Sequence, residues 1–236
     1  MASQHIVASF DQDLGGVQMR LMRMGALVET AITDALRALE TRDLDLSERV
    51  RLGDRVIDAM DAEIKEDTAR ILALRAPAAR DLRMVLSVMA MSTHLERCGD
   101  YAKNIAKRHP ALAEAAPIEN SIMALSRMGR IVVSMLSDAL DAAIHKDADL
   151  AEAARARDLE VDQAYNALFR ALLTYMMENP RNITTCMHLH FIAKNIERIG
   201  DHATSVAEQS LYLIRGERPE EDRPKGDTTA FIAPEG

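Results

Sequence analysis

Apolar residues recur along most of the chain at steps of three and four, the spacing of one buried helix face. The clearest stripe is formed by Leu14, Val17, Leu21, Met24 and Val28. Turn and capping residues interrupt such stripes at several points, which predicts a series of long helices. We expect them at roughly 10–40, 46–75, 79–109, 118–145, 150–178 and 182–215.

Helix starts and stops are marked by residues with known capping preferences. Asp45 with Glu48, and Asp149 with Glu152, have the spacing of a capping box with aspartate as the N-cap. They predict the starts of the second and fifth helices, and a proline region follows each of these two helices.

The polar pattern repeats after about one hundred residues. The pentad Glu96-Arg97-Cys98-Gly99-Asp100 recurs 101 positions later as Glu197-Arg198-Ile199-Gly200-Asp201. Earlier in each copy the offset is 104, and small length changes near the prolines account for the drift. The chain is therefore a duplication of one unit with three helices.

Long helices joined by short turns pack antiparallel into bundles. The predicted fold is all-α, with two tandem related three-helix bundles at 1–113 and 114–216. Residues 217–236 contain prolines and acids with little periodicity, so we expect a disordered acidic tail there.

The amino-acid composition is typical of a helical protein and disfavours several functional classes. Hydrophobic residues make up 48% of the chain but aromatic residues only 3%, and the formal net charge is −8. This charge disfavours nucleic acid as a ligand, and the arginines at 75, 80 and 83 read as solvated helix faces. Two cysteines do not form a disulfide framework, and no apolar run is long enough to span a membrane. We expect a cytoplasmic protein that meets a membrane only through partners.

Each copy carries two carboxylate pairs at i,i+4, which places both members on one helix face. If the second and third helices of a copy are antiparallel neighbours, four carboxylates converge on one patch. Oxygen donors of this kind suit iron, manganese, magnesium or calcium better than a structural zinc. The candidate metal ligands are Asp54, Asp58, Glu96, Asp100, Asp158, Asp162, Glu197 and Asp201.

Two other interpretations of these acids stay open. They are either ordinary surface charge or ion-paired with Arg55, Arg97 or Arg198. No histidine follows a glutamate by three residues, which argues against a di-iron oxidase. His94 and His202 lie close to the pentads and are candidates for outer contacts. No nucleotide-binding loop or nucleophile elbow is present, so we expect no enzyme activity.

The chain resembles the PhoU family, accessory proteins of bacterial phosphate-specific transport. The resemblance covers roughly residues 5–215 and is most specific in the doubled pentad. The segments that carry it are 18–26, 77–83, 94–106 and 195–208.

The resemblance implies two related three-helix bundles with iron or zinc clusters at the eight carboxylates named above. It also implies a negative regulator of the phosphate regulon, which connects a phosphate transporter ATPase to a sensor histidine kinase without catalytic turnover. We expect a homodimer. One departure is that Asn104 of the first copy faces Ser205 of the second, which predicts unequal sites with a weaker second one. The alternative is a carboxylate-cluster metal-binding protein or metalloenzyme with a different role, in which manganese or magnesium is also a candidate ion.

Overall fold

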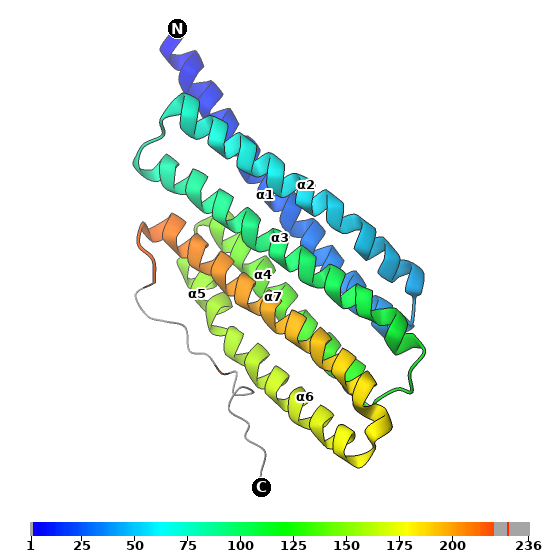
Figure 1. Ribbon diagram of the computed structural model, residues 1–236. Helices are drawn as coiled ribbons and strands as arrows, with labels where there is room; N and C mark the ends of the chain where they lie inside the picture. Colours follow the sequence, from blue (N-terminus) through cyan, green and yellow to red (C-terminus); the bar gives the residue numbers. More distant parts are fainter. Residues whose placement is uncertain (1, 220–225, 227–236) are drawn as a thin grey trace.

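The structure is a computed structural model that describes residues 2–219 and 226 (Figure 1). In this part of the chain every regular element is a helix. The helices are α1 (Ala2–Thr41), α2 (Leu44–Arg75), α3 (Ala79–Ala113), α4 (Ser121–His145), α5 (Ala148–Ala156), α6 (Asp158–Glu178) and α7 (Ile183–Arg215), with a 3-10 turn at Pro180–Asn182. The all-α prediction is confirmed.

One predicted helix is divided. The segment expected at 150–178 is split into α5 and α6 at Arg157, whose ψ of −9° departs from the α-helical value. The Arg157 guanidinium donates to Ser134 Oγ at 2.9 Å and to Asp138 Oδ2 at 3.3 Å, both on α4. This contact with another helix accompanies the break, and helical periodicity alone does not reveal it.

The predicted N-caps were wrong by two residues. Asp43 rather than Asp45 caps α2, because its carboxylate accepts from Leu46 N at 2.8 Å. Asp147 rather than Asp149 caps α5 in the same way. Arg42 has a φ of 54°, so the chain has already turned when it reaches Asp43, and the helix begins earlier than the capping-box spacing suggested.

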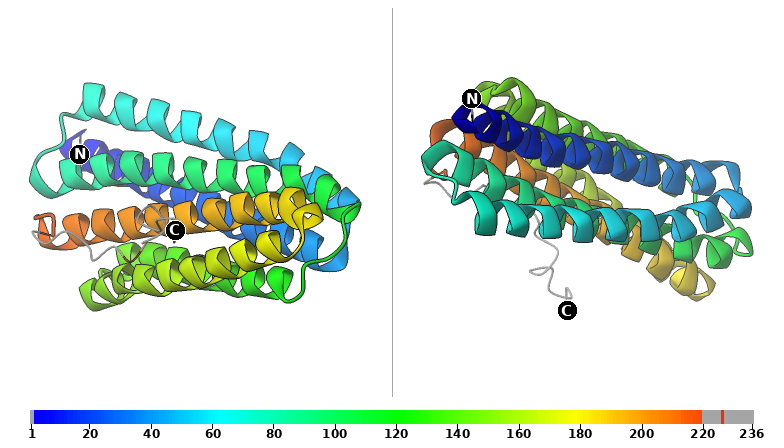
Figure 2. Two further views of the ribbon diagram at one scale, coloured as in Figure 1. Left: turned by 60° about the horizontal axis from the view of Figure 1, so that its bottom comes forward. Right: turned by 90° about the horizontal axis from the view of Figure 1, so that it is seen from above.

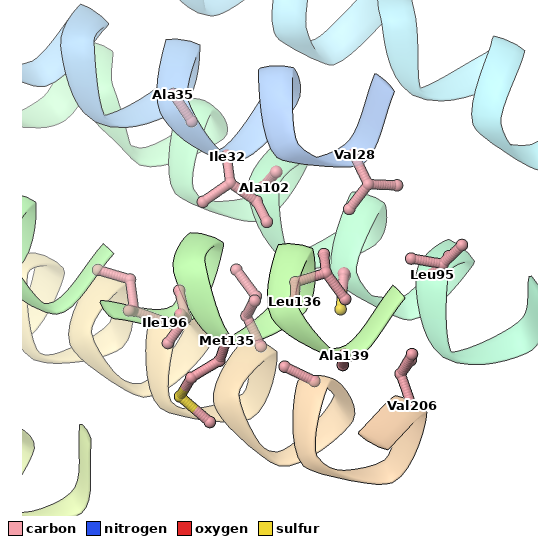
Figure 3. Packing of buried hydrophobic residues seen from close by; sticks show 14 of the residues in the cluster. Val28, Ile32, Ala35, Leu95, Ala102, Met135, Leu136, Ala139, Ile196 and Val206 are labelled. Atoms are coloured by element: carbon pink, nitrogen blue, oxygen red, sulfur yellow. The ribbon is translucent and has the colours of Figure 1, made fainter. Parts of the chain in front are cut away.

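The helices form two layers. Helices α2, α3, α7 and α6 lie side by side in one layer, and α1 and α4 lie behind them (Figures 1 and 2). A single cluster of buried apolar side chains runs through both repeats, as Figure 3 shows for Ile32 of α1, Leu95 of α3, Leu136 of α4 and Ile196 of α7. The two repeats therefore share one hydrophobic core.

Matching glycines allow the two repeats to approach closely. A Cβ atom at Gly25 of α1 would overlap the Leu140 side chain of α4, and one at Gly129 of α4 would overlap Leu36 of α1. Both pairs of equivalent residues are 104 positions apart, so the contact between α1 and α4 is reciprocal. A larger side chain at either glycine would require the facing leucine or the helix itself to shift.

The expected tail at 217–236 lies largely outside the described residues. Across the part of the chain that the structure covers, no helix combines the length and the apolarity needed to cross a bilayer.

Candidate functional site

The first acidic patch lies where α2 and α3 approach each other. The patch consists of Asp54 and Asp58 of α2 with Glu96 and Asp100 of α3. Gly99 allows this approach, because a Cβ atom there would lie 3.0 Å from Ile57 Cδ1 and 3.5 Å from Asp54 Oδ1. The glycine of the pentad thus brings the α3 backbone against the acidic face of α2.

A lysine that sequence reasoning did not select lies inside this patch. Lys103 Nζ is 2.5 Å from Asp54 Oδ2 and 2.5 Å from Asp100 Oδ1. Burial lowers the pKa of Lys103, but its hydrogen bonds to Asp100 and Asp54 outweigh burial and raise that pKa overall. The ammonium group is therefore held in its charged form between two of the four predicted ligands.

Asp54 is the most enclosed acid of the first patch. Its side chain is only 5% exposed, and Oδ1 is buried with no hydrogen-bond partner among the residues that the structure describes. One oxygen of Asp54 is thus neutralised by Lys103, while the other remains able to accept a donor or a cation.

Asp58 and Glu96 are crowded by like charge. Burial and the charge of Asp54 raise the pKa of Asp58. Burial together with the charge of Asp100 raises the pKa of Glu96, although Arg97 opposes the shift. Arg97 lies 3.4 Å from Glu96 Oε2 and 3.6 Å from Asp100 Oδ2. The ion pairing predicted for Arg97 is present, but it leaves the patch with excess negative charge.

The second patch is more deeply buried than the first. Asp158, Asp162 and Glu197 are 4%, 5% and 7% exposed, and Asp201 is half-buried. Gly200 is the equivalent of Gly99 and likewise lies close to the facing helix, because a Cβ atom there would lie 3.4 Å from Asp158 Oδ1. The duplicated pentad therefore builds the same approach of two helices twice.

The charge partners differ between the two patches. At the position of Lys103 the second repeat has Thr204, which is buried and whose hydroxyl has no hydrogen-bond partner within the described part of the chain. Lys194 lies 2.9 Å from Glu197 Oε1. The alignment of the repeats pairs Lys103 with Thr204, so this difference was already visible in the sequence.

Asp162 also binds a residue from beyond α7. Gly226 N donates to Asp162 Oδ2 at 2.6 Å, and Asn166 Nδ2 donates to Gly226 O at 2.6 Å. A Cβ atom at Gly226 would lie 2.8 Å from Leu159 Cδ1, so glycine suits this close contact. The first repeat has Ala62 where the second has Asn166, and an alanine side chain cannot donate the hydrogen bond that Asn166 makes.

The histidines considered as outer contacts lie between the repeats instead. His94 Nδ1 and His202 Nδ1 are 3.0 Å apart, which joins α3 to α7. Tyr101 stacks on His202 with ring centroids 5.6 Å apart, and Arg198 lies over the Tyr101 ring. Among the described residues Arg198 contacts this ring, while its pairing with an acid stays a prediction.

The carboxylates have the right donor chemistry for a hard cation, but their arrangement is not a ready-made metal site. Among the residues that the structure describes, no group of three or more histidine, cysteine or acidic side chains is placed to hold one ion. In the first patch an ammonium group already stands between two of the acids. A metal ion that bridged these two acids through the same oxygens would displace Lys103.

Comparison with known proteins identifies relatives of nearly full length. The family described as PhoU domain matches residues 21–109 and again 125–210. A protein of Caulobacter vibrioides named phosphate-specific transport system accessory protein PhoU homolog is 44% identical over 225 residues, covering 95% of this chain and 98% of the relative. A Zymomonas mobilis protein of the same name is 46% identical, covering 94% and 93%.

Two solved structures share the fold. The crystal structure of PhoU from Pseudomonas aeruginosa matches with a TM-score of 0.85 and 40% identity, covering 88% of this chain and all (100%) of that one. The phosphate transport system regulatory protein PhoU from Streptococcus pneumoniae matches with a TM-score of 0.83 and 31% identity, covering 90% and 100%.

Proposed function

This chain belongs to the PhoU family, and from that membership we propose that it is an accessory protein of phosphate transport. In this role it contacts a phosphate transporter ATPase and a sensor histidine kinase, and it keeps phosphate-starvation genes silent when phosphate is plentiful. The observation that carries the proposal is the near-complete alignment with relatives named as phosphate-specific transport system accessory proteins. A helical adaptor needs partner surfaces rather than a catalytic centre, and the family is not known for catalysis.

A strain with an in-frame deletion of the gene tests the regulatory role. We expect a phosphate-regulon reporter to be active in phosphate-rich medium in this strain and silent again after complementation with the intact gene. A reporter that stays silent in the deletion strain contradicts the proposal.

The partners are tested by capture from cells grown at high phosphate. We expect the tagged protein to retain the transporter ATPase and the sensor kinase, and a tagged helical protein of similar negative charge to retain neither. Equal recovery with the two baits contradicts the specific partnership. Light scattering of the purified protein tests the homodimer that we also propose, since a mass of 26.1 kDa would be that of a monomer.

We further propose that the acidic patches bind a hard divalent cation. Iron and zinc are the ions that the family resemblance implies, and manganese and magnesium suit the same oxygen donors. The support is the excess negative charge of the first patch and the buried Oδ1 of Asp54, which has no hydrogen-bond partner in residues 2–219 and 226. A bound ion would offset the negative charge of the carboxylates and reduce the repulsion between them.

Metal analysis of the purified protein tests this part of the proposal. We expect the double variant Glu197→Ala, Asp201→Ala to lose the metal of the second patch and to keep that of the first. The matched control is Glu152→Ala with Asp149→Ala, on a neighbouring helix of the same repeat and outside both patches. Unchanged metal content in the patch variant contradicts metal binding there.

A further inference from the structure

A pocket at one end of the molecule collects basic side chains. It lies between the start of α3, the end of α7 and the turn between α4 and α5, and its volume is about 300 Å³. Arg80, Arg83 and Lys146 line it, together with apolar groups such as Met84 and Leu213. Among the described residues no acidic side chain contributes to its wall.

The three cations lack the acidic partners that other basic residues of this chain have. Arg75, five positions before Arg80, lies 2.9 Å from Asp13 Oδ2. Within the described ranges 2–219 and 226, neither Arg80, Arg83 nor Lys146 forms an ion pair. In a chain with a net charge of −8, three unpaired cations around one pocket create a local positive potential. Arg80 lies in the first turn of α3, where the helix dipole adds to that potential.

Arg83 distinguishes this pocket from an ordinary basic surface. Its guanidinium Nε is buried and has no hydrogen-bond acceptor in the part of the chain that the structure describes. A guanidinium cannot lose its proton to escape this situation, and a buried donor without an acceptor is unfavourable. Arg83 also lines the pocket, and the other N–H donors of its guanidinium can donate to an anionic oxygen atom bound there.

The end of α7 lies close to Arg83. Gly216 has a φ of 84°, a backbone conformation that favours glycine. A Cβ atom at this position would lie 3.4 Å from Arg83 Cζ, which is an ordinary van der Waals distance. The guanidinium of Arg83 is therefore a near neighbour of the C-terminal end of α7.

We infer that this pocket binds a phosphate group, either free orthophosphate or the phosphate of a small ester. Planar guanidinium groups match phosphate oxygens through paired hydrogen bonds, and Lys146 adds a point charge. The apolar wall at Met84 and Leu213 provides contact area for the organic part of an ester. The inference uses only the pocket and its charges, so it does not rest on the proposed phosphate-accessory role.

Titration calorimetry of the full chain with sodium phosphate and, separately, with ATP tests the inference. We expect saturable binding of at least one of them and about tenfold or greater weakening in Arg83→Gln. Lys146→Gln should weaken binding less, because a flexible ammonium contributes a single point charge. Arg170→Gln is the matched control, because Arg170 is an exposed arginine of α6 outside this pocket.

The pattern across the two ligands identifies the source of the phosphate. Binding of both ligands with similar affinity indicates recognition of the phosphate group alone, and binding of ATP alone indicates an ester that uses the apolar wall. Absence of binding by both ligands overturns the inference. So does equal binding by wild type and Arg83→Gln, once circular dichroism shows that the variant is folded.

A second measurement keeps the stability of the variant separate from its binding. Whichever of phosphate and ATP binds in calorimetry should raise the melting temperature of the wild type and of Arg170→Gln but not that of Arg83→Gln. Sodium chloride at equal ionic strength reports general salt effects, and a rise of equal size in all three proteins with that ligand overturns the inference.

Discussion

At the scale of single residues, the two acidic patches differ most at one equivalent position. Lys103 places a charged ammonium between Asp54 and Asp100, whereas the second repeat has the uncharged, buried Thr204 at that position. The first patch thus has Lys103 between two of its acids, whereas in the second patch Lys194 contacts Glu197 and the backbone of Gly226 donates to Asp162. Two sites that look alike as carboxylate motifs are therefore chemically unequal.

Replacement of Lys103 by threonine tests this difference. Lys103→Thr leaves the nearly buried Asp54 without its counter-charge, so we expect a loss of about 2 kcal/mol in the free energy of unfolding, between the values for exposed and buried pairs. Added manganese should recover part of that loss in the variant by taking the vacated position. Urea unfolding with and without the metal measures both effects.

Lys107→Thr is the control, because Lys107 is exposed one turn later on the same helix. Equal losses in the two variants, or no response of Lys103→Thr to manganese, would contradict the role assigned to Lys103.

At the scale of helices, apolar periodicity predicted most of the elements because each helix buries one continuous stripe. The errors occurred where another part of the chain determines the backbone. The α5–α6 break at Arg157 coincides with bonds to α4, and the start of α2 depends on the left-handed Arg42. The duplication predicted that the carboxylate pairs meet. It did not predict Lys103 between them, because a lysine three residues after Asp100 also fits an exposed helix face.

The contact between α1 and α4 gives a prediction about glycine. Gly129→Ala should destabilise the protein by about 1 kcal/mol or more, because overpacking against Leu36 exceeds the gain in helix propensity. Gly25→Ala should have a similar effect through Leu140. Thermal or urea unfolding of each variant measures the change.

Gly53 provides the matched control on α2, because a Cβ atom there meets nothing within 4 Å. Gly53→Ala should therefore stabilise the protein by about 0.5–1 kcal/mol through helix propensity alone. If all three alanine variants are stabilised, the close approach of α1 and α4 does not constrain these positions.

At the scale of the whole molecule, the interface between the two repeats contains a pair of titratable residues, His94 and His202. His94 of α3 and His202 of α7 share one short contact, which requires one ring nitrogen to donate and the other to accept. Burial lowers the pKa of His94, although the charge of Glu208 on α7 opposes the shift. Tyr101 stacks on His202, and Arg198 lies over the Tyr101 ring. Protonation of both rings would place two positive charges side by side.

Because the pKa of His94 is lowered in the fold, we expect the free energy of unfolding to decrease in mild acid. The pKa of His94 is lower in the folded chain than its ordinary value of 6.5, so the unfolded chain takes up the proton first. Stability is therefore fully present above pH 6.5 and falls as the pH drops from 6.5 toward the folded-state pKa, by at most about 1.4 kcal/mol per pH unit for this group.

Urea unfolding at about pH 7.5 and about pH 5.5 measures the effect. His94→Gln should lose less stability between the two conditions than the wild type does. His145→Gln should behave as the wild type, since His145 is exposed at the end of α4. Equal losses in all three proteins would show that other groups govern the acid response.

The reciprocal contacts of Gly25 with Leu140 and of Gly129 with Leu36 have the form of a two-fold dimer interface, in which the same surface is used twice. In a true dimer of identical subunits, a substitution in one acidic patch is copied into the other, because one codon encodes both. Here the linker from 114 to 120 joins the halves in one chain, and each half has its own codons. The joined chain can thus keep a symmetric scaffold while its two patches diverge, with lysine at 103 and threonine at 204.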